Sequence, residues 1–264
     1  MLTRSAPASA NCSGGYLLAG VGTGYFYGIP LFANYNFLGF ALYSGTVSSS
    51  TAASISSTML PRAVPAFNIV ASGDSITQGT GAIDGWNTLH YAEPLLNHPA
   101  DITNTAVEGS VTAGALGDTN YPTIATSLIG NLYNSSYTKN IYYLASGTND
   151  LHEASTGAAA WANDMQALEN AKSLGFKTVV ATVMHEYGET AAQATEVNNF
   201  NTLARAAVGS SYLDAIVDYA ADVRLGNSGI YYPAYSGDGT HPNEAGYQVM
   251  GTIAAPVFNS IIGP

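Results

Sequence analysis

From about residue 65 to the C-terminus, short apolar runs alternate with segments long enough to form helices. The runs lie at 66–72, 101–107, 140–146, 177–183 and 213–219, and the helical segments lie near 86–97, 121–134, 157–174, 192–208 and 243–258. Strands that alternate with helices along a chain form a parallel sheet with helices on both faces. The pattern therefore predicts an α/β fold with a central, mostly parallel five-stranded sheet over residues 65–264.

The first 64 residues differ from the rest in composition. Residues 5–61 contain no Asp, Glu, Lys or Arg, and residues 16–43 are rich in aromatic side chains and glycine. The stretch 16–43 is long enough to span a bilayer, but its glycines, Pro30 and two asparagines leave no clean apolar block of about 20 residues. We therefore expect an irregular or β-rich extension over residues 1–64, with short strands or a clasp at 16–43. Membrane or protein contact through 16–43 is the alternative, and 44–58 is expected to be a linker.

Charged residues are scarce in this chain, at 9% of the sequence against roughly 25% in a typical soluble domain. The net charge of −11 argues against nucleic acid as a partner, because such binding depends on basic residues that neutralise phosphates. It also argues against electrostatic docking on anionic membranes. A neutral ester of a sugar or a lipid is the substrate class that agrees best with this composition.

The cellular location has only indirect signals in the sequence. Cys12 is the single cysteine, so an intrachain disulfide is excluded and cysteine usage does not identify the compartment. The opening MLTRSAPASA has one Arg but no continuous apolar core, so no ordinary signal peptide is visible. The charge-poor surface nevertheless leads us to expect an extracellular or periplasmic protein.

Polar blocks follow the predicted strands at positions where chemistry is expected. They read GDSIT (73–77) after the first strand, EGS (108–110) after the second, GTND (147–150) after the third, and GDGTHPN (237–243) beyond the fifth. In sheets of this kind, ligands bind beyond the carboxyl ends of the strands. The four blocks are therefore expected to surround one pocket.

Residues of these blocks can supply nucleophilic catalysis. The hydroxyl of Ser75 is a poor nucleophile and needs an adjacent base, which His241 can provide because imidazole both takes and returns a proton. Asp238, three residues before His241, can fix its tautomer and stabilise the imidazolium. An oxyanion could be bound by the backbone N–H of Gly109 and the side-chain amide of Asn149.

The four blocks, in this order, resemble those of the SGNH hydrolases, the GDSL-type esterases and lipases. GDSIT, NTAVEGS, GTND and DGTHPN match the four family blocks in turn, across roughly residues 66–246. The resemblance implies a flavodoxin-like three-layer α/β/α sandwich, with Ser75 as nucleophile, His241 as base and Asp238 as its orienting acid. It further implies an oxyanion hole formed by the N–H groups of Ser75 and Gly109 and the amide of Asn149.

Other residues near the blocks receive supporting assignments. Gly114 is a nearby alternative to Gly109 in the second block. Asp74 is expected to cap the turn after it, with a role as an extra catalytic acid as the alternative, and Asp150 is expected to make structural hydrogen bonds. His185 follows the fourth strand and is a candidate for lining the pocket, the alternative being a surface or satisfied core histidine.

We expect neither a cofactor nor a metal. A metal held by Asp74, Asp238 and His241 would have only one histidine ligand, with no second His or Cys at a suitable spacing. Trp86 and Trp161 are expected in helix cores, with sugar-stacking platforms as the alternative.

The sequence thus predicts a serine esterase that acts through an acyl-enzyme, most simply by removing acetyl or other short acyl groups from carbohydrate. A lipase or lysophospholipase-type esterase is the runner-up, and the uncharged aromatic segment 16–43 is its main support. Two further possibilities are an acyltransferase, which passes the acyl group to a sugar hydroxyl, and a structural or binding protein docked through its N-terminal segment. Chain length, alcohol and oligomeric state stay open.

Overall fold

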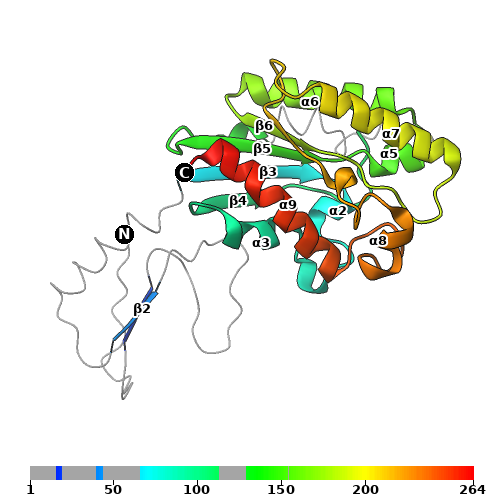
Figure 1. The fold of residues 1–264 in the computed structure, drawn as a ribbon. Coiled ribbons are helices and arrows are strands. Elements are labelled where there is room, and N and C mark those ends of the chain that lie inside the picture. The colour runs from blue at the N-terminus through cyan, green and yellow to red at the C-terminus, as the bar shows by residue number, and fades with distance from the viewer. Residues whose placement is uncertain (1–15, 20–39, 44–65, 113–128, 154) are drawn as a thin grey trace. The chain divides into compact units, whose positions relative to one another are not determined.

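The computed structural model describes residues 16–19, 40–43, 66–112, 129–153 and 155–264 (Figure 1). The chain divides into two units, Met1–Val64 and Pro65–Pro264. In the first unit, β1 (Tyr16–Ala19) pairs antiparallel with β2 (Phe40–Tyr43), in the stretch for which short strands are predicted. Cys12, Gly114 and the predicted linker at 44–58 lie outside the described residues.

The second unit is built on a five-stranded sheet in which all neighbouring strands are parallel. Its strands are β3 (Phe67–Gly73), β4 (Ala100–Asn104), β5 (Lys139–Ala145), β6 (Lys177–Ala181) and β7 (Ala215–Val217). The order β4-β3-β5-β6-β7 places the first strand of the unit between its second and third. This is the flavodoxin-like strand order. In such sheets, ligands bind beyond the carboxyl ends of the strands at the point where the strand order reverses, which here lies between β3 and β5. The predicted α/β fold is confirmed.

Helices cover both faces of the sheet and make a three-layer sandwich (Figure 1). One face carries α3 (Thr88–Ala92) and α9 (Glu244–Ile262), and the other carries α6 (Gly157–Ser173) and α7 (Ala191–Ala206). Short helices lie beyond the strand ends: α2 (Ser75–Gln78), α5 (Thr148–His152) and α8 (Ser228–Ala234). Single 3₁₀ turns occur at Ile83–Gly85, Glu93–Leu95, Ile129–Leu132 and Tyr219–Ala221.

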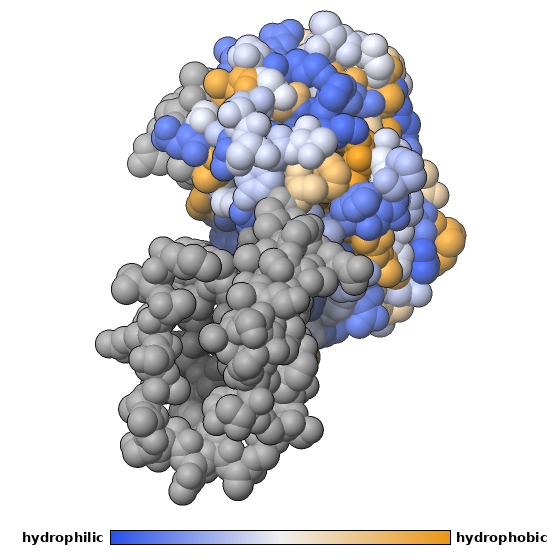
Figure 2. All heavy atoms as spheres, turned by 90° about the vertical axis from the view of Figure 1, so that its left-hand side faces the viewer, coloured by the Kyte–Doolittle hydropathy of each residue, from blue (hydrophilic) through white to orange (hydrophobic). Residues whose placement is uncertain are grey.

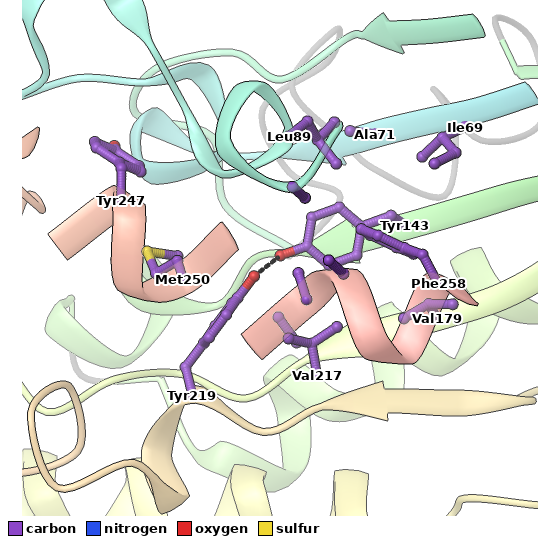
Figure 3. Packing of buried hydrophobic residues seen from close by; sticks show 14 of the residues in the cluster. Ile69, Ala71, Leu89, Tyr143, Val179, Val217, Tyr219, Tyr247, Met250 and Phe258 are labelled. Carbon is purple, nitrogen blue, oxygen red and sulfur yellow. Dashed lines mark hydrogen bonds between the residues drawn. The ribbon is translucent and has the colours of Figure 1, made fainter. Parts of the chain in front are cut away.

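The central strands β3 and β5 are mostly apolar because both of their faces are buried, whereas the edge strand β4 (ADITN) is only partly buried. On β3, Ile69 and Ala71 pack toward α3 and α9, whereas Val70 packs toward α6 and α7. Figure 3 shows the first of these two cores, in which the hydroxyl groups of Tyr143 and Tyr219 are hydrogen-bonded at 2.8 Å. This bond satisfies two buried polar groups within an otherwise apolar layer.

Two details differ from the sequence-based expectation. The second strand ends at Asn104 rather than at residue 107, at the point where the Asn104 side chain accepts a hydrogen bond from the N–H of Ala106 (3.0 Å). Trp86 is not a core residue: it is 43% exposed and stacks on His90 with ring centroids 4.5 Å apart. Trp161 is buried, as expected. Of the expected helix at 121–134, residues 121–128 lie outside the described part and 129–132 form a 3₁₀ turn.

Among the described helices, none combines the length and the apolarity that crossing a bilayer requires. Figure 2 views the end of the molecule at which β3 begins, and its coloured atoms show hydrophilic and hydrophobic side chains interspersed.

Candidate active site

Ser75 is the first residue of α2 and lies directly beyond the carboxyl end of β3. Asp74 caps this helix, because its Oδ1 accepts a hydrogen bond from the N–H of Ile76 at 3.0 Å. Gly79 ends the helix after a single turn, with a left-handed backbone conformation at φ +113°. The cap and the stop together hold Ser75 at a fixed position on a very short helix.

Gly73 occupies a place where no side chain fits. A Cβ atom there would lie 2.1 Å from Thr77 Oγ1 and 2.2 Å from the carbonyl oxygen of Ala145. The hydroxyl of Thr77 instead donates a hydrogen bond of 2.8 Å to that carbonyl, which ties α2 to the end of β5. Gly73 and Asp74 therefore each meet a local structural demand at the strand end.

Ser75, His241 and Asp238 form one hydrogen-bonded line. Ser75 Oγ lies 2.9 Å from Nε2 of His241, and Nδ1 of the same ring lies 2.7 Å from Oδ2 of Asp238. The structure thus brings together the three residues that the sequence predicts as nucleophile, base and orienting acid, although 166 positions separate Ser75 from His241.

The turn that carries His241 is organised by hydrogen bonds to its own side chains. Oδ1 of Asp238 accepts bonds from the N–H groups of Thr240 (2.9 Å) and His241 (2.8 Å). Ser236, which no sequence motif singled out, accepts a bond from the N–H of Gly239 (2.8 Å) and donates to the carbonyl of His241 (2.7 Å). These bonds fix the angle at which His241 leaves the turn.

The electrostatics of the turn favour an ionised Asp238. Burial raises the pKa of this carboxyl, but hydrogen bonds from the His241 ring and from the backbone amides outweigh it and lower the pKa to about 2. Asp238 is therefore a carboxylate at neutral pH and can stabilise a positively charged His241.

Of the candidate oxyanion donors, Asn149 lies on α5 and Gly109 lies on the loop after β4. Asn149, in the first turn of α5, donates one amide hydrogen to the carbonyl of Ser110 (2.8 Å), and its second amide hydrogen has no partner among the described residues. Gly109 has φ +75°, and the N–H of Glu108 beside it donates to Gln78 Oε1 at 2.7 Å. Hydrogen bonds therefore connect Asn149 to the loop that contains Gly109, and connect that loop to α2, the helix that carries Ser75.

Asp74 and Asp164 are two buried carboxyl groups near these residues. Asp74 is buried, its Oδ2 has no hydrogen-bond partner among the described residues, and burial raises its pKa to about 6. Asp164 on α6, which no sequence motif identified, is also buried, and burial raises its pKa well above the usual value. Its two oxygens lie 2.9 and 2.8 Å from the hydroxyl of Ser146. A hollow of about 20 Å³, large enough for one water molecule, is lined by Asp74 and Ser146.

Asp150 and His185 have structural partners. Asp150 is buried and accepts hydrogen bonds from the N–H (2.7 Å) and hydroxyl (2.6 Å) of Thr112. The ring of His185 lies 2.6 Å from Glu189 Oε1 through Nδ1 and 3.4 Å from Asn198 Oδ1 through Nε2. The structure does not include His185 in the line of Ser75, His241 and Asp238.

Within the described ranges, no group of three or more His, Cys, Asp or Glu side chains is arranged to hold a metal ion. The chemistry that the site can perform with its own groups is proton transfer at Ser75, through a histidine whose opposite nitrogen faces a carboxylate.

Comparison with known families agrees with this site. Residues 71–249, more than half of the chain, match the model of the GDSL-like lipase/acylhydrolase family. The match covers Ser75, Gly109, Asn149, Asp238 and His241. The fold and the hydrolase site define a carboxylic ester hydrolase, and the chain belongs to the GDSL-like lipase/acylhydrolase family, as the sequence resemblance implied. No match was found among curated protein sequences.

Solved structures share the fold at low sequence identity. A member of the lipolytic G-D-S-L family from Veillonella parvula is 18% identical, with a TM-score of 0.61 over 73% of this chain and 98% of that one. Est24, a carbohydrate acetylesterase from Sinorhizobium meliloti, is 12% identical, with a TM-score of 0.57 over 74% and 99%. A variant of an acetyl-xylooligosaccharide esterase from a Geobacillus species is 14% identical, with a TM-score of 0.53 over 75% and 94%.

Proposed function

We propose that this hydrolase cleaves carboxylic esters through an acyl-enzyme formed on Ser75. The observation that carries the proposal is the hydrogen-bonded line from Ser75 through His241 to Asp238. Ser75 Oγ attacks the ester carbonyl while Nε2 of His241 takes its proton, and the carboxylate of Asp238 stabilises the imidazolium. His241 then protonates the leaving alcohol. In the second half, His241 takes a proton from water, which attacks the acyl carbonyl and releases the acid and Ser75.

The negative charge that develops on the carbonyl oxygen requires preorganised donors. We assign this role to the N–H of Ser75 at the start of α2, the N–H of Gly109 and the second amide hydrogen of Asn149. The bond from Asn149 to Ser110 supports this assignment, because it fixes the amide while leaving one donor unused. The proposed steps use only side chains, backbone amides and water.

The substrate that we propose is a carbohydrate carrying a short acyl group, with acetyl as the first candidate. The charge-poor surface agrees with a neutral substrate. Two structures with this fold bear names that state activity on acetylated carbohydrate. An extracellular or periplasmic location, proposed on composition alone, would place the enzyme where polysaccharides occur.

The first test compares the wild type with Ser75→Ala on p-nitrophenyl acetate, butyrate and octanoate. Loss of a serine nucleophile lowers kcat by a factor on the order of 10⁴ or more. We expect that loss on the acetate, with unfolding by denaturant unchanged, and a preference for acetate over octanoate in the wild type. Equal rates for wild type and Ser75→Ala would refute the serine mechanism. A preference for octanoate would instead favour the lipid esterase, and transfer product in excess of free acid with added sugar would favour the acyltransferase.

A further inference from the structure

Two tyrosine rings stack beside the turn that carries His241, and one of them is exposed. Tyr187, in the loop between β6 and α7, packs face to face with Tyr232 of α8, with ring centroids 4.5 Å apart and an angle of 28° between the rings. Tyr187 is 57% exposed, and Tyr232 is half-buried. Within the described part of the chain, neither tyrosine hydroxyl has a hydrogen-bond partner.

The backbone fixes this tyrosine pair to the catalytic turn from two sides. The N–H of Tyr187 donates a bond of 3.0 Å to the carbonyl of Gly239, which lies between Asp238 and His241 in the sequence. Gly239 has φ +95°, and a Cβ atom there would lie 2.9 Å from Cβ of Tyr187, so the two residues are in close contact. From the other side, the buried Tyr231 donates a bond of 2.9 Å to the carbonyl of Thr240.

The position of the pair matters because of where the alcohol leaves. His241 protonates the departing oxygen, so the alcohol part of the ester must lie against the turn that carries this histidine. The other aromatic stack with an exposed ring among the described residues, Trp86 on His90, makes no hydrogen bond or ring contact with that turn. Of the two stacks, the tyrosine pair is therefore the one attached to the site at which the alcohol is released.

Resting on the function proposed above, we propose that Tyr187 and Tyr232 form the binding surface for a pyranose ring of the alcohol part of the substrate. A sugar ring presents C–H groups on its faces and hydroxyl groups on its edge. An exposed tyrosine offers an apolar ring face for the first and a phenol oxygen for the second, at low cost in conformational entropy. Prior stacking of the two rings means that little side-chain freedom is lost when the sugar binds.

The test compares two acetates that share an acyl group and differ in the alcohol: an acetylated methyl xylopyranoside and ethyl acetate. Removing one aromatic partner from a stack lowers affinity by about fivefold to tenfold. We expect Tyr187→Ala and Tyr232→Ala to raise KM for the pyranoside by that factor while kcat/KM for ethyl acetate stays within about twofold of the wild type. Tyr187→Phe keeps the ring and should retain most of the wild-type activity on the pyranoside. Trp86→Ala serves as the matched variant, since it removes an exposed stacked ring elsewhere.

Three outcomes would overturn this inference. An equal loss on both acetates in Tyr187→Ala and Tyr232→Ala would show that the rings only support the turn. An equally selective loss in Trp86→Ala, or no selective loss in either tyrosine variant, would contradict a sugar site at the pair. Failure of the proposed function is recognised separately, because wild type that cleaves neither acetate would contradict the esterase mechanism. Binding of deacetylated methyl xylopyranoside to Ser75→Ala, followed by NMR, still reports on the tyrosines in that case.

Discussion

At the scale of single residues, the two carboxyl oxygens of Asp74 lie in different environments. Its Oδ1 caps the helix that begins at Ser75, and its Oδ2 is buried without a partner among the described residues. Burial raises the pKa of this carboxyl to about 6, although hydrogen bonds from the N–H groups of Ile76 and Thr77 and the nearby His241 act in the opposite direction. Asp74 therefore holds its proton up to a higher pH in the folded protein than in the unfolded chain.

This difference predicts a pH dependence of stability. The folded state binds more protons than the unfolded state between about pH 4 and pH 6, so the stability that Asp74 contributes is complete below about pH 4 and is lost as the pH rises through 6. A pKa moved from 3.8 to about 6 corresponds to about 3 kcal/mol at neutral pH. Asp74→Asn keeps the capping oxygen and removes the charge. We expect this variant to be more stable than the wild type at pH 8 and less sensitive to pH between 4 and 7.

Urea unfolding at a series of pH values measures this effect. Glu169→Gln, at an exposed position on α6, is the control for the removal of a negative charge. If Asp74→Asn and the wild type lose stability in parallel as the pH rises, the buried carboxyl does not carry the pH dependence.

Some residues of the site could be predicted from short sequence motifs, and others could not. Ser75, Asp238 and His241 could be predicted because each stands in a short block whose order along the chain is informative. Ser236 and Asp164 could not, because a serine in a turn and an aspartate in a helix are common. Ser236 acts through the conformation of its own turn, in which it bonds to Gly239, and Asp164 acts through Ser146, which lies 18 positions away.

At the scale of elements, helix α9 helps to position helix α2, which carries Ser75. Tyr247 on α9 is fully buried, and its hydroxyl lies 2.9 Å from the carbonyl of Ile76 and 2.8 Å from that of Thr80. Ile76 lies in α2 directly after Ser75, and Thr80 follows Gly79, the residue that ends this helix. One hydroxyl group thus connects the C-terminal helix to the segment that carries the nucleophile.

Tyr247→Phe should therefore affect catalysis as well as stability. Loss of the hydroxyl leaves buried carbonyl groups unpaired, which costs about 1–3 kcal/mol. A shift of Ser75 relative to His241 should lower kcat by about threefold to tenfold. Tyr143→Phe is the matched control, since it also removes a buried hydroxyl, whose hydrogen-bond partner is Tyr219 rather than a group of α2. Denaturant unfolding and kcat on p-nitrophenyl acetate measure the two effects. Equal kcat values in the two variants would contradict the positioning role.

The long elements were the predictable ones. All five strands and the helices α6, α7 and α9 lie within a few residues of the predicted ranges, because burial on both faces of a strand or on one stripe of a helix leaves a clear apolar pattern. The helices α2, α5 and α8 are each one or two turns long and are fixed by caps and tertiary hydrogen bonds. Such short helices leave no periodic pattern in the sequence.

At the scale of the whole molecule, the described site draws all its residues from the second unit. The family match also begins only at residue 71. We therefore expect a chain that starts at Pro65 to fold and to keep kcat on p-nitrophenyl acetate within about twofold of the full chain. Circular dichroism and turnover measure the two properties. A truncated chain that unfolds, or that folds with much lower kcat, would mean that residues 1–64 complete the catalytic domain.

The 166 positions between Ser75 and His241 also order events during synthesis of the protein. A ribosome makes the N-terminal part first, so the growing chain carries its nucleophile for most of translation without the base that activates it. The Asp238–His241 turn, and then α9 with Tyr247, are made after the other described parts of the site. Synthesis of this turn and helix, rather than synthesis of Ser75, therefore sets the earliest moment at which the protein can become an esterase.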